Sequence, residues 1–220
     1  MLDFGFYNMD CMEGMKQFPD KFFDLAIVDP VYGDVTQGGY MANKACNKAE
    51  STQYHTALWK QPKTPPEYFS ELFRVSKNQI IWGGNYFVEA INKNSQCWIV
   101  WDKDNTGNYA DCELAYTSFT TAVRKFKFRW NGMLQENMKN KEIRIHPTQK
   151  PVALYEFLLN NYAKPGDKIL DTHVGSASSL IACHNLGFEY VGFELDTDYF
   201  NAASERLESV KAQTSIFDYL

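Results

Sequence analysis

The residues Phe22-Phe23-Asp24-Leu25-Ala26-Ile27-Val28 are followed directly by Asp29-Pro30-Val31-Tyr32-Gly33. The first seven are mostly apolar, as in a strand that is buried on both faces of a parallel sheet. Asp29 stands where that strand would end, and open α/β sheets bind their ligands at the carboxyl ends of their strands. This stretch therefore predicts both a fold class and the position of a functional site.

Further apolar segments of the same kind lie at residues 79–82, 97–101 and 168–170. Helical patterns begin at prolines between them, at residues 65–73 and 151–162, and proline is well tolerated in the first turn of a helix. Strands that alternate with helices are typical of the α/β class. We therefore expect a doubly wound, mostly parallel sheet.

The composition bounds the architecture. With 220 residues, 45% of them hydrophobic, the chain can bury one substantial core, so a single domain over residues 1–220 is expected. Residues 34–64 and 102–145 are largely polar at their start and follow no sustained period, so both are expected to be insertions that recognise the substrate.

Cysteine usage and hydropathy exclude several classes. The five cysteines form no CxxC pair, which favours neither a zinc site nor a disulfide framework, so no metal is expected. No apolar run reaches the length of a membrane span, and the amino terminus lacks the pattern of a signal peptide. A cytoplasmic protein without a membrane partner is predicted.

A second site motif lies in the carboxyl-terminal third. Residues 167–171 read as a strand that ends in Asp171, and the small residues after it, including Gly175 and Ser176, form a turn into a helix. Such a turn brings backbone N–H groups to a ligand. A further strand ends in Glu194, 23 residues after Asp171, a spacing at which an acid reaches ribose hydroxyls in nucleotide-binding sheets.

Three blocks together carry a family resemblance: Asp29 to Gly33, His146-Pro147-Thr148-Gln149-Lys150-Pro151, and residues 171–194. In their order and spacing they resemble the β-class DNA amino-methyltransferases of phages and bacterial restriction-modification systems, which modify adenine N6 or cytosine N4. The resemblance implies a Rossmann-like methyltransferase fold, permuted so that the catalytic half comes first, with an inserted recognition region. It also implies S-adenosylmethionine as the cofactor.

The resemblance assigns the catalytic roles to Asp29, Pro30 and Tyr32. The lone pair of an aromatic amino group is delocalised, and acceptors aimed at its hydrogens, here the Asp29 carboxylate and the Pro30 carbonyl, would localise it. Tyr32 would stack on a base flipped out of the duplex. The alternative is an ordinary Asp-Pro turn with Tyr32 packed beneath it.

The resemblance also assigns the cofactor residues. Asp10 and Cys11 would flank the adenine ring of the cofactor, although Asp10 could equally cap the helix that follows it. The other expected cofactor contacts are His146, Thr148, Lys150, Asp171, Gly175, Ser176 and Glu194. Three positions depart from the family pattern: Val31 replaces a proline, His173 a phenylalanine and Ala177 a glycine.

Substrate contacts are assigned less directly. Trp82 and Asn85 follow a predicted strand and could line the base pocket, or they could serve packing and the turn. The segment from Arg124 to Lys150 carries eight lysines and arginines against two glutamates, so Arg124, Lys125, Lys127 and Arg129 are expected to contact DNA phosphates. A solvated charged strand is the alternative reading.

The predicted activity is site-specific methylation of adenine N6 in DNA. The family links Asp at the first motif position with adenine and Ser with cytosine N4, and cytosine N4 is the nearest alternative. A noncatalytic DNA- or cofactor-binding protein on the same scaffold is the second, and an RNA or a protein glutamine is a further possible acceptor. The expected partners are DNA, a second copy in a homodimer, and a cognate restriction endonuclease in a bacterial host cell.

Overall fold

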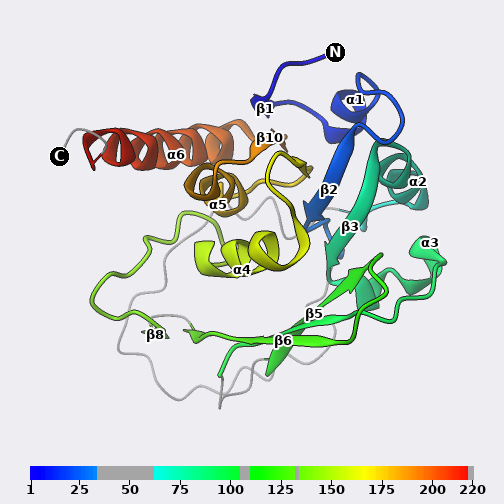
Figure 1. Cartoon of the computed structure of the whole chain (residues 1–220), viewed down its shortest axis with the longest axis horizontal. Helices are drawn as coiled ribbons and strands as arrows, with labels where there is room; N and C mark the ends of the chain where they lie inside the picture. The colour runs from blue at the N-terminus through cyan, green and yellow to red at the C-terminus, as the bar shows by residue number, and fades with distance from the viewer. Residues whose placement is uncertain (34–61, 105–109, 132–133, 218–220) are drawn as a thin grey trace.

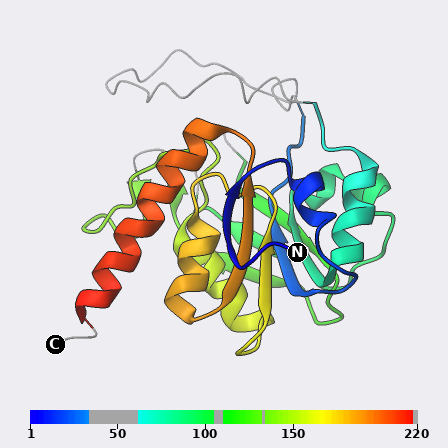
Figure 2. The ribbon, with the colours of Figure 1, turned by 90° about the horizontal axis from the view of Figure 1, so that it is seen from above.

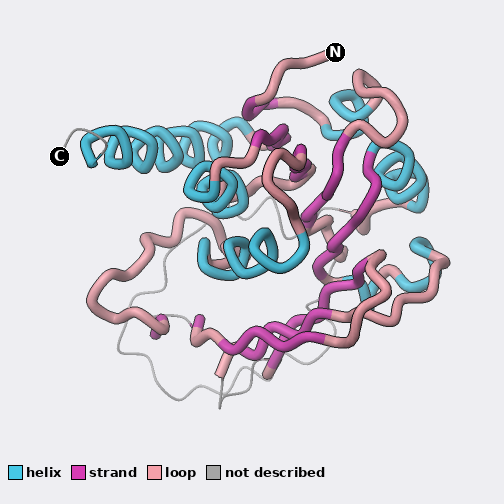
Figure 3. Tube along the Cα trace, viewed as in Figure 1, coloured by secondary structure: helices cyan, strands magenta, loops and turns pink. Residues whose placement is uncertain are grey.

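A computed structural model describes residues 1–33, 62–104, 110–131 and 134–217. Its main element is an eight-stranded sheet in the order β1-β10-β9-β2-β3-β5-β4-β6. Figure 3 shows these strands in magenta and the helices in cyan. The strands are β1 (Gly5–Asn8), β2 (Phe23–Val28), β3 (Ser76–Trp82), β4 (Ile99–Asp102), β5 (Cys112–Thr117), β6 (Arg124–Lys127), β9 (Lys168–Asp171) and β10 (Glu189–Glu194).

Helices cover both faces of the sheet, as Figures 1 and 2 show. One face carries the first three helices and the other carries α4 and α5, while α6 packs on α5 and on the edge formed by β1 and β10. The helices are α1 (Cys11–Met15), α2 (Pro66–Val75), α3 (Val88–Ile91), α4 (Val152–Tyr162), α5 (Ser178–Leu186) and α6 (Thr197–Phe217), with a short 3-10 turn η3 (Gly84–Tyr86).

Strand β2 shows why the sheet is covered twice. Leu25 and Ile27 pack in the apolar cluster that includes Leu154 of α4, whereas Ala26 and Val28 pack in the cluster that includes Phe69 of α2. Successive side chains of a strand point to opposite faces, so an apolar run of this length requires cover on both sides. The predicted doubly wound fold is confirmed.

The order of the strands confirms the permutation. β9 pairs in parallel with β2, although most of the chain separates them, and β1 pairs in parallel with β10 at the edge of the sheet. The first strand of the chain therefore completes the half of the sheet that carries the cofactor motif. The chain reverses its direction of winding between β9 and β2, which is the switch point where such sheets bind ligands.

Part of the predicted insertion 102–145 belongs to the main sheet. β5 lies between β3 and β4 and is antiparallel to both, and β6 forms the edge beside β4. A small separate hairpin, β7 (Trp130–Asn131) with β8 (Leu134–Gln135), follows. Most of the other predicted insertion, residues 34–61, lies outside the described residues. Among the described helices, none is long and apolar enough to cross a membrane.

Candidate active site at the carboxyl edge of the sheet

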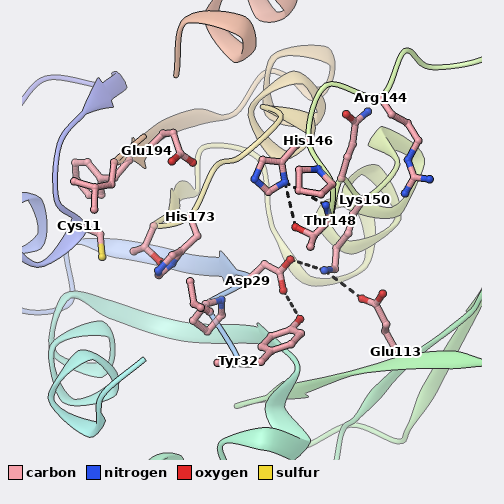
Figure 4. A pocket seen from close by; sticks show the side chains of 18 of the residues that line it. Cys11, Asp29, Tyr32, Glu113, Arg144, His146, Thr148, Lys150, His173 and Glu194 are labelled. Carbon is pink, nitrogen blue, oxygen red and sulfur yellow. Dashed lines mark hydrogen bonds and ion pairs between the residues drawn. The ribbon is translucent and has the colours of Figure 1, made fainter. Parts of the chain in front are cut away.

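A cavity of about 420 Å³ opens where the two halves of the sheet meet. Its walls come from the loops that follow β1, β2, β9 and β10, together with β5 and the segment before α4. Cys11, His173 and Glu194 lie on one side of Asp29, and Lys150, Glu113 and Arg144 lie on the other (Figure 4). We refer to these two sides of the cavity as its compartments, with Asp29 between them.

Both carboxylate oxygens of Asp29 accept hydrogen bonds from neighbouring side chains. The Tyr32 hydroxyl donates to Oδ1, and the Lys150 ammonium donates to Oδ2 at 2.5 Å. The Tyr32 ring stacks on Tyr86, with centroids 5.0 Å apart and planes inclined by 19°. Gly83, at φ +64°, makes this packing possible, because a Cβ there would lie 2.2 Å from the Tyr32 ring.

Lys150, which was predicted to contact the cofactor, forms an ion pair with Asp29. Its Nζ also lies 3.2 Å from Glu113 Oε2, and Glu113 forms a second ion pair with Lys103. Burial alone would raise the pKa of Glu113, but Lys150 and Lys103 outweigh it and lower that pKa to about 2. Burial likewise opposes the charged form of Lys150, yet Asp29 and Glu113 hold its pKa above the ordinary value.

The compartment on the β10 side carries the predicted ribose acid. Glu194 lines the cavity and accepts hydrogen bonds from the backbone N–H groups of Gly175 at 2.8 Å and Asp196 at 2.9 Å. Asp10 and Cys11 also line it. Asp10 Oδ1 accepts from the N–H groups of Met12 and Glu13, so the predicted helix cap is confirmed and Asp10 still faces the cavity.

Asp171 and Ser176 lie behind the cavity wall and support it. Asp171 is 2% exposed and accepts hydrogen bonds from Ser179 and from the backbone N–H of His173. Burial raises its pKa to about 7. The Ser176 carbonyl accepts from Arg206 at 2.6 Å. These residues hold the loop that presents His173, the position at which this chain has histidine in place of the family's phenylalanine.

His146 and Thr148 line the cavity. The His146 ring packs edge-on against Tyr199 at 4.5 Å, and its Nδ1 lies 3.1 Å from Thr148 Oγ1. Burial lowers the pKa of His146 to about 4, so the ring is neutral at neutral pH. The segment 146–150 therefore lies in the cavity wall.

Comparison with known proteins decides the family. A model of the DNA methylase family matches residues 56–205. The chain is 40% identical over 239 residues to the type II methyltransferase M.HpaI of Haemophilus parainfluenzae. The aligned region covers 91% of this chain and 73% of M.HpaI. The chain belongs to the N6/N4 DNA methylase family. It is a DNA methyltransferase that uses S-adenosylmethionine.

Other relatives agree with this family. The type II methyltransferase M.HinfI of Haemophilus influenzae is 25% identical over 96% of this chain and 70% of that protein. The fold is shared with the M1.HpyAVI complex with S-adenosylmethionine (TM-score 0.56, 21% identity, 91% of this chain and 98% of that chain). The fold is also shared with the cytosine-N4-specific PvuII DNA methyltransferase, with a TM-score of 0.61 and 11% identity. That match covers 96% of this chain and 92% of the PvuII enzyme chain.

The cavity of this DNA methylase fits the cofactor. Its volume lies within the usual range for small-molecule sites, about 300–1,000 Å³. Carboxylates suit a ligand that carries a sulfonium cation and ribose hydroxyls, and those of Asp10, Asp29 and Glu194 line the cavity. Of the residues predicted to contact the cofactor, Asp10, Cys11, His146, Thr148, Lys150 and Glu194 line the cavity, whereas Asp171, Gly175 and Ser176 do not.

The predicted substrate residues divide into three groups. Trp82 is fully buried and does not line the cavity, so it cannot contact a base directly; Lys150 Nζ lies 5.4 Å from its ring. Asn85 is exposed on η3, outside the cavity lining. The basic residues of β6 and the loop after it are partly neutralised, because Lys125 pairs with Asp102 at 3.4 Å and Lys127 and Arg129 pair with Asp104.

The register of β6 separates its basic residues further. Arg124 is opposite Ile99, at the amino end of β4, whereas Lys127 is opposite Asp102, at the end nearer the cavity. Lys127 and Arg129 therefore lie closer to the active-site edge than Arg124 does. Sequence reasoning did not assign a site role to the cavity-lining residues Glu113, Trp130 and Arg144, because no local motif marks them.

Proposed function

We propose that this DNA methyltransferase transfers the methyl group of S-adenosylmethionine to N6 of adenine. The observation that carries the proposal is the Asp29 carboxylate, fixed by Tyr32 and Lys150 between the two compartments of one cavity. The compartment toward Glu194 suits the cofactor, and the compartment toward Trp101, Trp130 and Arg144 suits a flipped base.

The chemistry requires orientation more than covalent catalysis. S-Adenosylmethionine, when bound, supplies an electrophilic methyl group on a positively charged sulfur. Asp29 and the Pro30 carbonyl would accept the two amino hydrogens and localise the nitrogen lone pair toward that methyl group. The nitrogen–carbon bond forms as the carbon–sulfur bond breaks, with its electron pair left on sulfur, and the nitrogen then releases a proton.

Three features support the base, its entry and the contact with DNA. Asp at the first motif position accompanies adenine specificity in the family that the motifs resemble. An incoming amino group would replace the Tyr32 hydroxyl as a donor to Asp29, which would free the Tyr32 ring to stack on the base while Tyr86 supports it from behind. Lys127 and Arg129 would exchange Asp104 for phosphates on the active-site edge.

The test is methyl transfer from labelled S-adenosylmethionine to unmethylated DNA, followed by nucleoside analysis. We expect N6-methyladenine from the wild type and a loss of about 10²- to 10³-fold in rate for Asp29→Asn, which removes the charge and keeps the shape. Asp24→Asn, at the opposite end of β2, is the matched control and should retain activity.

Other products would overturn particular parts of the proposal. N4-methylcytosine would reject the adenine assignment and keep the catalytic role of Asp29. Cofactor binding by folded protein without transfer to any DNA would favour the noncatalytic alternative. Full activity of Asp29→Asn would reject Asp29 as the acceptor.

A further inference from the structure

A row of alternating charges connects the catalytic carboxylate to strand β5. Asp29 pairs with Lys150, Lys150 with Glu113, and Glu113 with Lys103. Figure 4 shows the Lys150 side chain between Asp29 and Glu113. Glu113 belongs to no motif of the family resemblance, and it reaches the site only because β5 is inserted antiparallel between β3 and β4.

Lys150 depends on both acids for its charge. Its side chain is only 4% exposed, and its Nζ has Asp29 Oδ2 at 2.5 Å and Glu113 Oε2 at 3.2 Å. A buried ammonium without sufficient carboxylate partners tends to release its proton. Neutral Lys150 would donate more weakly to Asp29, and one of the two contacts that orient the acceptor would be lost.

Glu113 also balances the charge around the reacting nitrogen. Lys150 places a positive charge beside Asp29, close to where the amino nitrogen becomes positive during methyl transfer. The Glu113 carboxylate lies on the other side of that ammonium and offsets its charge, and Lys103 in turn stabilises Glu113. The arrangement can orient Asp29 firmly without placing an uncompensated cation next to the target.

We propose that Glu113 is a positioning residue for methyl transfer, which keeps Lys150 charged and directed at Asp29. This inference rests on the proposed role of Asp29 as the acceptor for the target amino group, and it holds for either adenine or cytosine. Among the described residues, the charged and titratable groups that line the Lys150 side of the cavity are Asp29, Tyr32, Lys103, Glu113, Arg144 and His146. Tyr155 of α4 interacts with the Asp29 and Glu113 carboxylates.

The decisive variants are Glu113→Gln, which removes the charge, and Glu113→Asp, which restores it on a shorter side chain. We expect Glu113→Gln to lower the single-turnover rate about tenfold at saturating cofactor and DNA, with unchanged affinity for S-adenosylmethionine by calorimetry. Because the pKa of Lys150 would fall in Glu113→Gln, the loss of rate at alkaline pH should begin about one pH unit lower in this variant than in the wild type.

Three controls separate positioning from stability. Glu113→Asp should recover most of the rate and the wild-type pH profile. Glu71→Gln breaks a partly buried ion pair with Arg74 on α2, far from the site. This variant should change neither the methyl-transfer rate nor its pH profile. Thermal unfolding of each variant shows whether the protein is folded at the assay temperature.

A second readout requires no turnover. In protein with ¹³C-labelled lysine side chains, the Lys150 resonance, identified by its absence in Lys150→Met, should titrate at lower pH in Glu113→Gln than in the wild type. An unmoved Lys150 titration, or a rate loss with an unchanged pH profile, would overturn the proposal. If the wild type transfers no methyl group to any DNA, the proposed function fails while this titration still decides the link between Glu113 and Lys150.

Discussion

At the scale of single residues, His173 explains how this chain tolerates a departure from its family. The ring lines the cofactor side of the cavity and packs edge-on against Tyr68, with centroids 5.3 Å apart. Burial lowers the pKa of His173 to about 4, so the imidazole is uncharged at neutral pH. A neutral aromatic ring can therefore occupy the place of the usual phenylalanine.

This view predicts the effect of restoring the family residue. His173→Phe should leave the affinity for S-adenosylmethionine nearly unchanged, because the substitution keeps a ring of similar size. His173→Ala should weaken binding by about tenfold, since the apolar contact area of the ring is lost. Calorimetric titration of both variants with S-adenosylmethionine measures these affinities. Equal losses of affinity in the two variants would show that the imidazole nitrogens bind the cofactor.

Ala177 is a second departure with a visible structural cost. It adopts the left-handed conformation, φ +61°, in the residue before α5, where glycine would be unstrained. Its methyl group is fully buried in the cluster formed with Leu180 and Leu207. The backbone strain at Ala177 destabilises the fold, whereas the burial of its methyl group stabilises it. The loop still presents the Gly175 N–H to the Glu194 carboxylate.

At the scale of elements, one ion pair joins the segment before α4 to the last helix. Arg206 of α6 donates to Glu142 Oε2 at 2.6 Å and to the Ser176 carbonyl at 2.6 Å. The other oxygen of Glu142 accepts from the backbone N–H of Val152 at 3.1 Å and so caps α4, where Pro151 offers no side-chain cap. The cofactor loop, α4 and α6 are thus fastened at one point.

We expect Arg206→Met to lower the free energy of unfolding by about 2–3 kcal/mol, because a largely buried carboxylate and a carbonyl lose their donor. Lys211→Met, on the same helix, removes a pair with the more exposed Glu208 and should cost less than about 1 kcal/mol. Urea unfolding measures both. Equal losses would mean that α6 is stabilised by its apolar contacts alone.

At the scale of the whole molecule, the active site makes stability depend on pH in two opposing ways. Burial raises the pKa of Asp171 from 3.8 to about 7, so its contribution to folding is complete below pH 3.8 and is lost as the pH rises through 7. Burial lowers the pKa values of His146 and His173 from 6.5 to about 4, so their contribution is complete above pH 6.5 and is lost as the pH falls toward 4.

Asp171→Asn isolates the first contribution. Between pH 5 and pH 8, the free energy of unfolding of the variant should rise by about 2–3 kcal/mol relative to that of the wild type, without cofactor. Urea unfolding at both pH values measures this difference, with Asp111→Asn, at an exposed position, as the control. Parallel pH curves for the wild type and Asp171→Asn would show that burial does not hold a proton on Asp171.

Much of the fold was accessible from the sequence, because its strongest signals are local. The apolar run before Asp29 and the acids that end β9 and β10 mark strand ends, and helices that begin at prolines separate some of the strands. The order of the motifs also predicted the permuted sheet. Helix α6 was not predicted, since its apolar face is short and much of its surface is polar.

The sequence by itself determined the class of fold, the family and the place of Asp29 at the end of a buried strand, since periodicity and motif order are written along the chain. Only the tertiary structure decided that Lys150 contacts Asp29, that Glu113 joins the site from β5, and that Trp82 is buried beneath it. The reason is physical: these contacts cross between strands and loops distant in sequence, and the pairing of strands, not any local pattern, sets which side chains meet.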